Sequence, residues 1–212
     1  GVAALTASTP DNTEADACVA TDAGVVCTIM VADCLPVLLA HTSGAVVGAA
    51  HAGWRGLAGQ SGVGVLESVM RALFERFQAL ALTSKAQAAI ENVANNAESF
   101  EAVARGTLAW LGPCIGPQAF EVGPEVREAF CAAGPQYSAC FVPSPTQQGK
   151  WLADLAGLAR LRLQAMGVTR IYGNDSSAAW CTVTQSARFF SHRRDTALLG
   201  GSGRLAACIW RG

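Results

Sequence analysis

The sequence predicts a single α/β domain, and three observations support that fold class. The chain has 212 residues, enough for one large domain of this kind. Hydrophobic residues make up 51% of it and charged residues only 15%, so a large core is expected and a mainly disordered chain is excluded. Apolar runs rich in β-branched residues fill much of the first fifty positions, whereas later runs have the spacing of amphipathic helices.

Strands are expected throughout the N-terminal quarter. The run 25–31 is β-branched and nearly continuous, which is typical of a strand buried on both faces. Thr42, Ser43 and Gly44 predict a turn between two further strands. The expected strands are 1–5, 17–20, 25–31, 36–40 and 45–50.

A Gly-rich turn and a long helix are expected next. Residues 51–64 contain five glycines. Apolar residues at intervals of four, from Val65 to Phe77, then predict a helix over 65–79. Residues 82–106 leave two interpretations open, namely a second helix with a break at its asparagines or a mobile insertion.

The C-terminal half is expected to alternate between helices and strands. A Gly-Pro pair predicts a helix that continues to residue 132. Residues 154–166 form an amphipathic pattern, with leucines on one side and Arg160 and Arg162 on the other. The remaining segments are a loop at 135–149 and strands at 108–111, 168–172 and 206–210.

Charge and cysteine content restrict the partners and the compartment. Lys and Arg number 15 and Asp and Glu number 16, so no broad basic field is available for nucleic acid or an anionic membrane. No apolar run is long enough for a spanning helix, and no secretory leader is evident. The eight cysteines are scattered without a CxxC pair, which favours reduced thiols in the cytoplasm.

Two side chains are the strongest candidates for chemistry. His51 ends an apolar run and enters the Gly-rich turn, where glycines let the backbone approach a ligand. Cys34 follows Asp33 inside an apolar stretch, and Pro36 indicates a break in the strand there. A strand–turn–strand connection can bring Cys34 and His51 to one sheet edge, where they suit Zn²⁺, copper or a nucleophilic Cys–His pair. Each also has a purely structural interpretation, as a buried thiol or a strand-capping imidazole.

Basic residues near this edge are candidates for binding an anion. Arg55 lies in the Gly-rich turn, ahead of a helix N-terminus, and is the first candidate for phosphate. The stretch 188–195 is densely basic and offers Arg193 or Arg194 as weaker candidates, unless it is a surface loop in which Asp195 pairs with an arginine. His41 precedes a turn and is expected to face solvent.

Several motifs in order resemble a known family. They are Ala-Asp-Cys-Leu-Pro-Val at 32–37, His-Ala-Gly-Trp-Arg-Gly at 51–56, and the segments 111–116, 120–123, 181–182, 188–195 and 209–210. Together they resemble the laccase-domain proteins, long labelled multicopper polyphenol oxidases and now described as purine nucleoside phosphorylases with adenosine deaminase activity. The resemblance covers nearly the whole chain. Two departures are His192 in place of a usual Tyr, and Ser202-Gly203-Arg204 in place of Thr-Gly-Arg.

The resemblance implies a compact α/β domain over residues 1–212, with layered mixed sheets flanked by helices and with its N-terminal part missing. It also implies a zinc site made of His, Cys and His, in which copper is the other possible metal. Cys34 and His51 match two of these ligands. The third His belongs to a Val-His-Gly motif near the N-terminus and would fall immediately before residue 1.

The resemblance further implies the reaction and its participants. The partners would be phosphate and a small purine nucleoside, namely adenosine, inosine or methylthioadenosine, and hydrolytic deamination of adenosine would be a second activity. Catalytic roles are expected for Cys34 and His51 at the metal, for Arg55 on phosphate and for Asp33 in orienting a ligand or moving a proton.

Three alternatives remain at this point. One is a metal-free Cys–His hydrolase acting on an amide such as one in a cell wall, with Cys34 as the nucleophile. Another is copper-dependent oxidation of phenols, although the three histidines of the chain cannot supply a multicopper centre. The last is a non-enzymatic binding partner.

Overall fold

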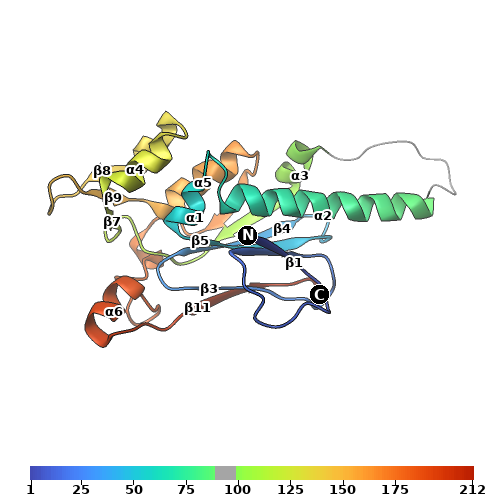
Figure 1. Cartoon of the computed structure of the whole chain (residues 1–212), viewed down its shortest axis with the longest axis horizontal. Coiled ribbons are helices and arrows are strands. Elements are labelled where there is room, and N and C mark those ends of the chain that lie inside the picture. The colour runs from blue at the N-terminus through green and yellow to red at the C-terminus, as the bar shows by residue number, and fades with distance from the viewer. Residues whose placement is uncertain (89–98) are drawn as a thin grey trace.

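A mixed six-stranded sheet forms the centre of the computed structural model (Figure 1). The model describes residues 1–88 and 99–212, with the side chains of 83–88 excepted. The strands lie in the order β1 (Val2–Leu5), β2 (Ala17–Ala20), β5 (Val47–Ala52), β4 (Leu35–His41), β6 (Thr107–Leu111) and β10 (Arg170–Gly173). The outer pairs β1–β2 and β6–β10 are parallel, and the inner pairs are antiparallel.

Helices cover one face of this sheet and a small second sheet covers part of the other (Figure 1). The second sheet pairs β3 (Cys27–Val31) with β11 (Leu205–Ile209) in antiparallel register. The helices are α1 (Trp54–Ala58), α2 (Val65–Ala88), α3 (Phe100–Gly106) and α5 (Leu155–Ala165). The chain thus has three layers, and the predicted α/β domain with layered mixed sheets flanked by helices is confirmed.

Alternation along the central strands explains the layering. In β4, Val37 and Leu39 are fully buried in the core cluster that includes Leu66 and Met70 of α2. Leu38 points to the opposite face and packs against the cluster of the small sheet. Because successive strand residues face opposite sides, one apolar strand serves two cores.

A peripheral unit lies beyond the sheets. It contains the three-stranded sheet β7 (Glu121–Val122), β9 (Trp151–Ala153) and β8 (Phe141–Pro143). The remaining elements are α4 (Pro124–Cys131), α6 (His192–Leu199) and the 3₁₀ turns Pro135–Cys140 and Ala178–Trp180. None of the helices in the described part of the chain is long and apolar enough to span a membrane.

The predicted strands and the helices at 124–132 and 154–166 are confirmed to within a few residues. Asp154 caps α5 by accepting a hydrogen bond from the Gly157 N–H, the interaction that makes Asp favourable at this position. Of the open segment 82–106, residues 82–88 continue α2 and Phe100–Gly106 form α3, whereas 89–98 lie outside the described residues.

Other expectations were wrong. Residues 135–149 are not only a loop, because they contain a 3₁₀ turn and β8. The Gly-rich segment 51–64 is a turn only in part, because it contains α1, and the basic stretch 188–195 is a loop only up to Ser191, after which α6 begins. Arg162 does not lie on a solvated face of α5 but is buried. Its partners lie far away in sequence, so the local pattern could not reveal them.

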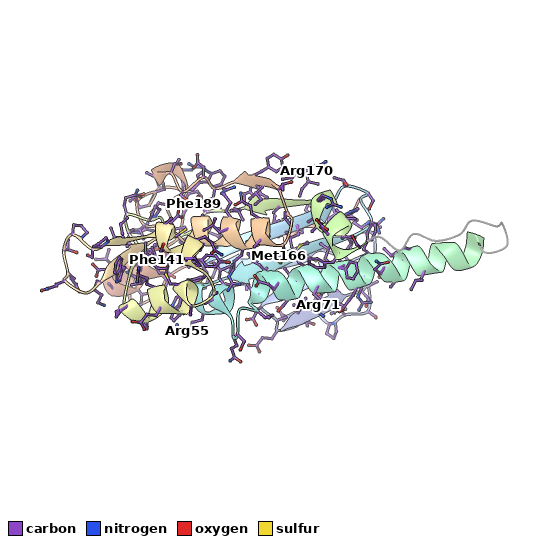
Figure 2. All side chains as sticks on the ribbon, turned by 90° about the horizontal axis from the view of Figure 1, so that it is seen from above. Arg55, Arg71, Phe141, Met166, Arg170 and Phe189 are labelled. Atoms are coloured by element: carbon purple, nitrogen blue, oxygen red, sulfur yellow. The ribbon has the colours of Figure 1, made fainter. Side chains whose placement is uncertain are left out.

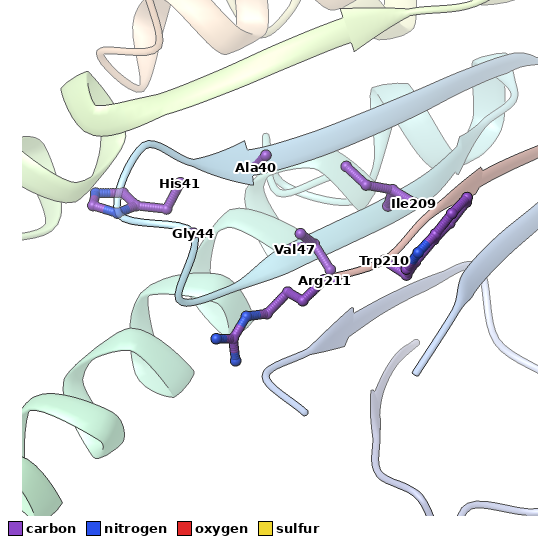
Figure 3. Close-up of a pocket in the computed structure, with 8 residues that line it drawn as sticks. Ala40, His41, Gly44, Val47, Ile209, Trp210 and Arg211 are labelled. Carbon is purple, nitrogen blue, oxygen red and sulfur yellow. The ribbon is translucent and has the colours of Figure 1, made fainter. Parts of the chain in front are cut away.

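His41 is also buried, contrary to its expected exposure to solvent. Its ring lies 4.4 Å from that of Phe77 on α2, and its Nδ1 is 2.8 Å from the hydroxyl of Ser43. A helix that packs over the turn therefore covers a residue that the turn alone would leave exposed. The residue borders a cavity of about 370 Å³ between the β4–β5 turn and the C-terminal segment, lined also by Val47, Trp210 and Arg211 (Figure 3).

Candidate functional site

Cys34 and His51 converge beside Gly53. Pro36 pairs with His51 across β4 and β5, and Cys34 stands two residues before Pro36, so both side chains lie on the same face of the sheet. A Cβ placed on Gly53 would be 2.9 Å from Cys34 Sγ and 3.9 Å from His51 Nε2. These two atoms therefore lie within 6.8 Å of one another. The predicted strand–turn–strand connection brings them to one end of the sheet.

Asp33 shapes the turn that presents Cys34. Its backbone has φ +78°, a conformation that Asp and Asn tolerate better than most residues. Its carboxylate accepts hydrogen bonds from the Thr182 hydroxyl at 2.5 Å and from the Arg193 N–H at 2.6 Å. Its carbonyl accepts one from the Ile115 N–H at 2.9 Å. Asp33 thus joins three distant segments beneath the site.

We expect Asp33→Asn to lower the free energy of unfolding by about 1.5–3 kcal/mol, because an amide cannot accept both carboxylate hydrogen bonds. Asn tolerates the positive φ, so backbone strain contributes little. Urea denaturation measures the change, with Asp22→Asn on the exposed surface as the control. A variant of normal stability that has lost turnover would instead identify Asp33 as a group that moves a proton.

Burial dominates the electrostatics of the pair. It raises the pKa of the Cys34 thiol, and the charge of Asp33 raises it further, while Arg204 acts in the opposite direction. Burial lowers the pKa of the His51 imidazole, Asp16 opposes this shift, and Arg204 lowers the pKa further. Both groups therefore favour their uncharged forms.

Arg204 is a site residue to which the sequence analysis assigned no role. It directly precedes β11, and Leu205 pairs with Val31, so Arg204 stands opposite Ala32, two residues from Cys34. Its positive charge acts to lower the pKa of the Cys34 thiol and that of the His51 imidazole. The Ser202-Gly203-Arg204 tripeptide is the sequence feature that could have drawn attention to Arg204, but sequence alone could not place this tripeptide beside residues 32–34.

The three arginines proposed from sequence lie in different environments. Arg55 is exposed on α1, and its guanidinium carbon lies 4.5 Å from the centre of the Trp54 ring. It lies on the same long edge of the molecule as Arg71 of α2 (Figure 2). Arg194 pairs with Asp195 at 2.6 Å and also donates to three backbone carbonyls. Arg193 donates its backbone N–H to Asp33, and its guanidinium lies 3.4 Å from the Glu121 carbonyl oxygen.

A cavity of about 890 Å³ borders His51. The segment 6–15 forms one wall, and β3 with the residues before it forms another. Its polar wall residues include Thr6, Thr9 and Thr13. A volume of this size lies within the range of small-molecule sites, so His51 borders a space that can hold a ligand.

The donor set at the site fits a soft or borderline metal ion but is incomplete. A thiol and an imidazole are ordinary zinc ligands, and a catalytic zinc site uses three protein ligands. Within residues 1–82 and 99–212, no three His, Cys, Asp or Glu side chains gather closely enough to hold an ion. All eight cysteines, which lie in the described part, are free.

Comparison with known proteins identifies the family. The family model described as "Multi-copper polyphenol oxidoreductase laccase" matches residues 1–212. "Purine nucleoside phosphorylase PA4543" of Pseudomonas aeruginosa is 40% identical over 99% of this chain and 70% of that protein. "Purine nucleoside phosphorylase YfiH" of Escherichia coli is 44% identical over 92% of this chain and 63% of that protein.

Solved structures agree with this assignment. Neisseria meningitidis protein NMB0706 is 39% identical, with a TM-score of 0.70 over 93% of this chain and 65% of that protein. YlmD from Geobacillus stearothermophilus is 27% identical, with a TM-score of 0.72 over 100% of this chain and 69% of that protein. The chain therefore belongs to the multi-copper polyphenol oxidoreductase laccase family.

Proposed function

We propose that this chain carries out phosphorolysis of purine nucleosides, with zinc as its metal and adenosine deamination as a second activity. The observation that carries the proposal is the convergence of Cys34 Sγ and His51 Nε2, with His51 lining a cavity of about 890 Å³. Relatives named purine nucleoside phosphorylase, 40% and 44% identical, support the reaction class. The substrates would be adenosine, inosine or methylthioadenosine.

Cys34 and His51 would hold the metal, with a third ligand from the Val-His-Gly motif of the family. The Asp16 carbonyl accepts the His51 N–H at 2.8 Å, and the Asp16 carboxylate lies 2.6 Å from the nitrogen of Gly1. The start of β1 is thus at the His51 end of the sheet. Bound zinc would supply a Lewis acid that activates water for deamination.

Product analysis tests the proposal. The protein is incubated with adenosine or inosine, with and without phosphate, and the products are separated chromatographically. Phosphate-dependent release of free base and ribose 1-phosphate supports phosphorolysis, and conversion of adenosine to inosine supports deamination. If neither product forms, the phosphorylase proposal fails, and inactivation of amide hydrolysis by alkylation of Cys34 would then favour the Cys–His hydrolase.

Gly53→Ala tests whether the spacing of the pair matters. The backbone at Gly53 has φ −70° and ψ 159°, so alanine fits it, but the new methyl would lie 2.9 Å from Cys34 Sγ. We expect zinc affinity to fall about tenfold or more, the usual cost of disturbing the groups that orient a ligand. A chelator competition titration measures this affinity.

Gly56→Ala is the matched control for this variant. A Cβ there would meet its nearest neighbours at 3.8–3.9 Å, which is ordinary contact, and the position lies in α1. Its zinc affinity should remain that of the unaltered protein. Equal affinities for both variants would show that Gly53 does not set the distance between the two ligands.

A further inference from the structure

The inference concerns Arg204, which stands at the end of the small sheet nearest Cys34. Antiparallel pairing of Leu205 with Val31 fixes its position, because the next step along both strands sets Arg204 opposite Ala32. The turn from Ala32 to Cys34 begins there, and Asp33 anchors this turn to distant segments. The location of Arg204 is therefore part of the folded framework.

Much of the hydrogen-bonding capacity of Arg204 is unused. Its NH1 donates to the carbonyl and hydroxyl of Ser202, at 3.2 and 2.9 Å, and lies 3.2 Å from the carbonyl of Gly203. Among the described residues, no bond engages its Nε or NH2, and no carboxylate lies within 4 Å. An exposed guanidinium that lacks a carboxylate partner can bind an oxyanion with two parallel N–H donors.

The charge of Arg204 reaches both side chains of the pair. It acts on the pKa of the Cys34 thiol, which directly precedes β4, and on that of the His51 imidazole on β5. Arg204 thus stands at the end of the sheets where Cys34 and His51 converge. Arg194, by contrast, uses its guanidinium on Asp195 and on backbone carbonyls.

We propose that Arg204, rather than Arg55, binds the orthophosphate that attacks the nucleoside. The proposal rests on the function proposed above and adds a residue to it. A phosphate oxygen forms a bond to C1′ of the sugar while the C1′–N9 bond breaks. The electron pair of that bond goes to the purine, which also takes up the proton of hydrogen phosphate, so the products are free base and ribose 1-phosphate. A guanidinium remains charged throughout and holds the anion in place.

Steady-state kinetics with each substrate varied in turn tests the proposal. Arg204→Gln is expected to raise the KM for phosphate about tenfold or more, the value of a hydrogen bond to a charged group, and to leave the KM for inosine nearly unchanged. Arg204→Lys is expected to recover part of the loss, because it keeps the charge without the two-pronged donor. Arg71→Gln is the matched control, since Arg71 is an exposed arginine on α2, on the helical side of the central sheet (Figure 2).

A titration with inorganic phosphate, followed by ³¹P NMR without nucleoside, gives a second measurement. Phosphate binding by the unaltered protein that is weakened in Arg204→Gln supports the proposal, even if no nucleoside is cleaved and the proposed function fails. Equal binding in both proteins overturns it. An unchanged KM for phosphate, or equal changes in both KM values, also overturns it.

Discussion

Removal of the Cys34 thiol or the His51 imidazole is expected to lower phosphorolysis about 100-fold or more, as loss of a metal ligand removes several kcal/mol of stabilisation from the transition state. Cys34→Ala and His51→Ala should each also lower the zinc content of the purified protein. Both side chains are only partly buried, so the variants should fold. Initial rates and elemental analysis of the same samples measure the two effects.

Two substitutions serve as matched controls. Cys208→Ala removes an exposed thiol on β11, and His192→Ala removes an exposed imidazole that contacts only Thr196 among the described hydrogen-bond partners. Both controls should keep the rate and the zinc content of the unaltered protein. Full zinc content together with full activity in Cys34→Ala would show that the thiol is a structural residue at the end of the sheet.

Replacement of Arg162 by methionine is expected to lower the free energy of unfolding by about 3–5 kcal/mol, the usual cost of breaking a buried ion pair on one side. Arg162 on α5 is only 2% exposed and lies 2.7 Å from the Glu67 carboxylate on α2. It also donates to the carbonyls of Ala58 at 2.7 Å and Gly62 at 3.1 Å. The variant leaves a half-buried carboxylate and two carbonyls without their donor.

A double-mutant cycle separates these contributions. The double variant, Arg162→Met together with Glu67→Gln, should recover part of the lost stability, because it no longer buries a carboxylate without its partner. Arg105→Met is the exposed control, since Arg105 and Glu101 form a surface ion pair whose loss should cost less than about 1 kcal/mol. Urea denaturation gives the values. A loss below about 1 kcal/mol for Arg162→Met would contradict this account of the α2–α5 contact.

Most of the secondary structure was predictable because its determinants are local. The β-branched run that ends at Val31 and the apolar run ahead of His51 become β3 and β5 within a few residues. The amphipathic pattern over 154–166 predicts α5, because the spacing of its leucines follows the period of a helix. The turn between β4 and β5 follows from three small polar residues. No contact with a distant segment is needed for any of these.

The candidate site was only partly predictable. Cys34 and His51 are seventeen positions apart, Cys34 directly before β4 and His51 on the adjacent antiparallel strand β5, so a hairpin connection was enough to bring them together. Arg204 reaches the same end of the sheet only because β11 pairs with β3, a register that no local pattern encodes. The pairing of Asp195 with an arginine was among the sequence-based alternatives, but the bonds of Arg194 to the carbonyls of Thr182 and Phe189 appear only in the structure.

The sequence by itself determined the fold class, the positions of most strands and helices, and the two side chains that lie beside Gly53. Only the tertiary structure decided that Arg162 is buried, that Asp33 anchors a turn, and which arginine stands beside Cys34. The physical reason is the range of the interactions involved. Backbone preference and hydrophobic spacing act within a few residues, whereas ion pairing, burial and strand register join residues that are distant in the chain.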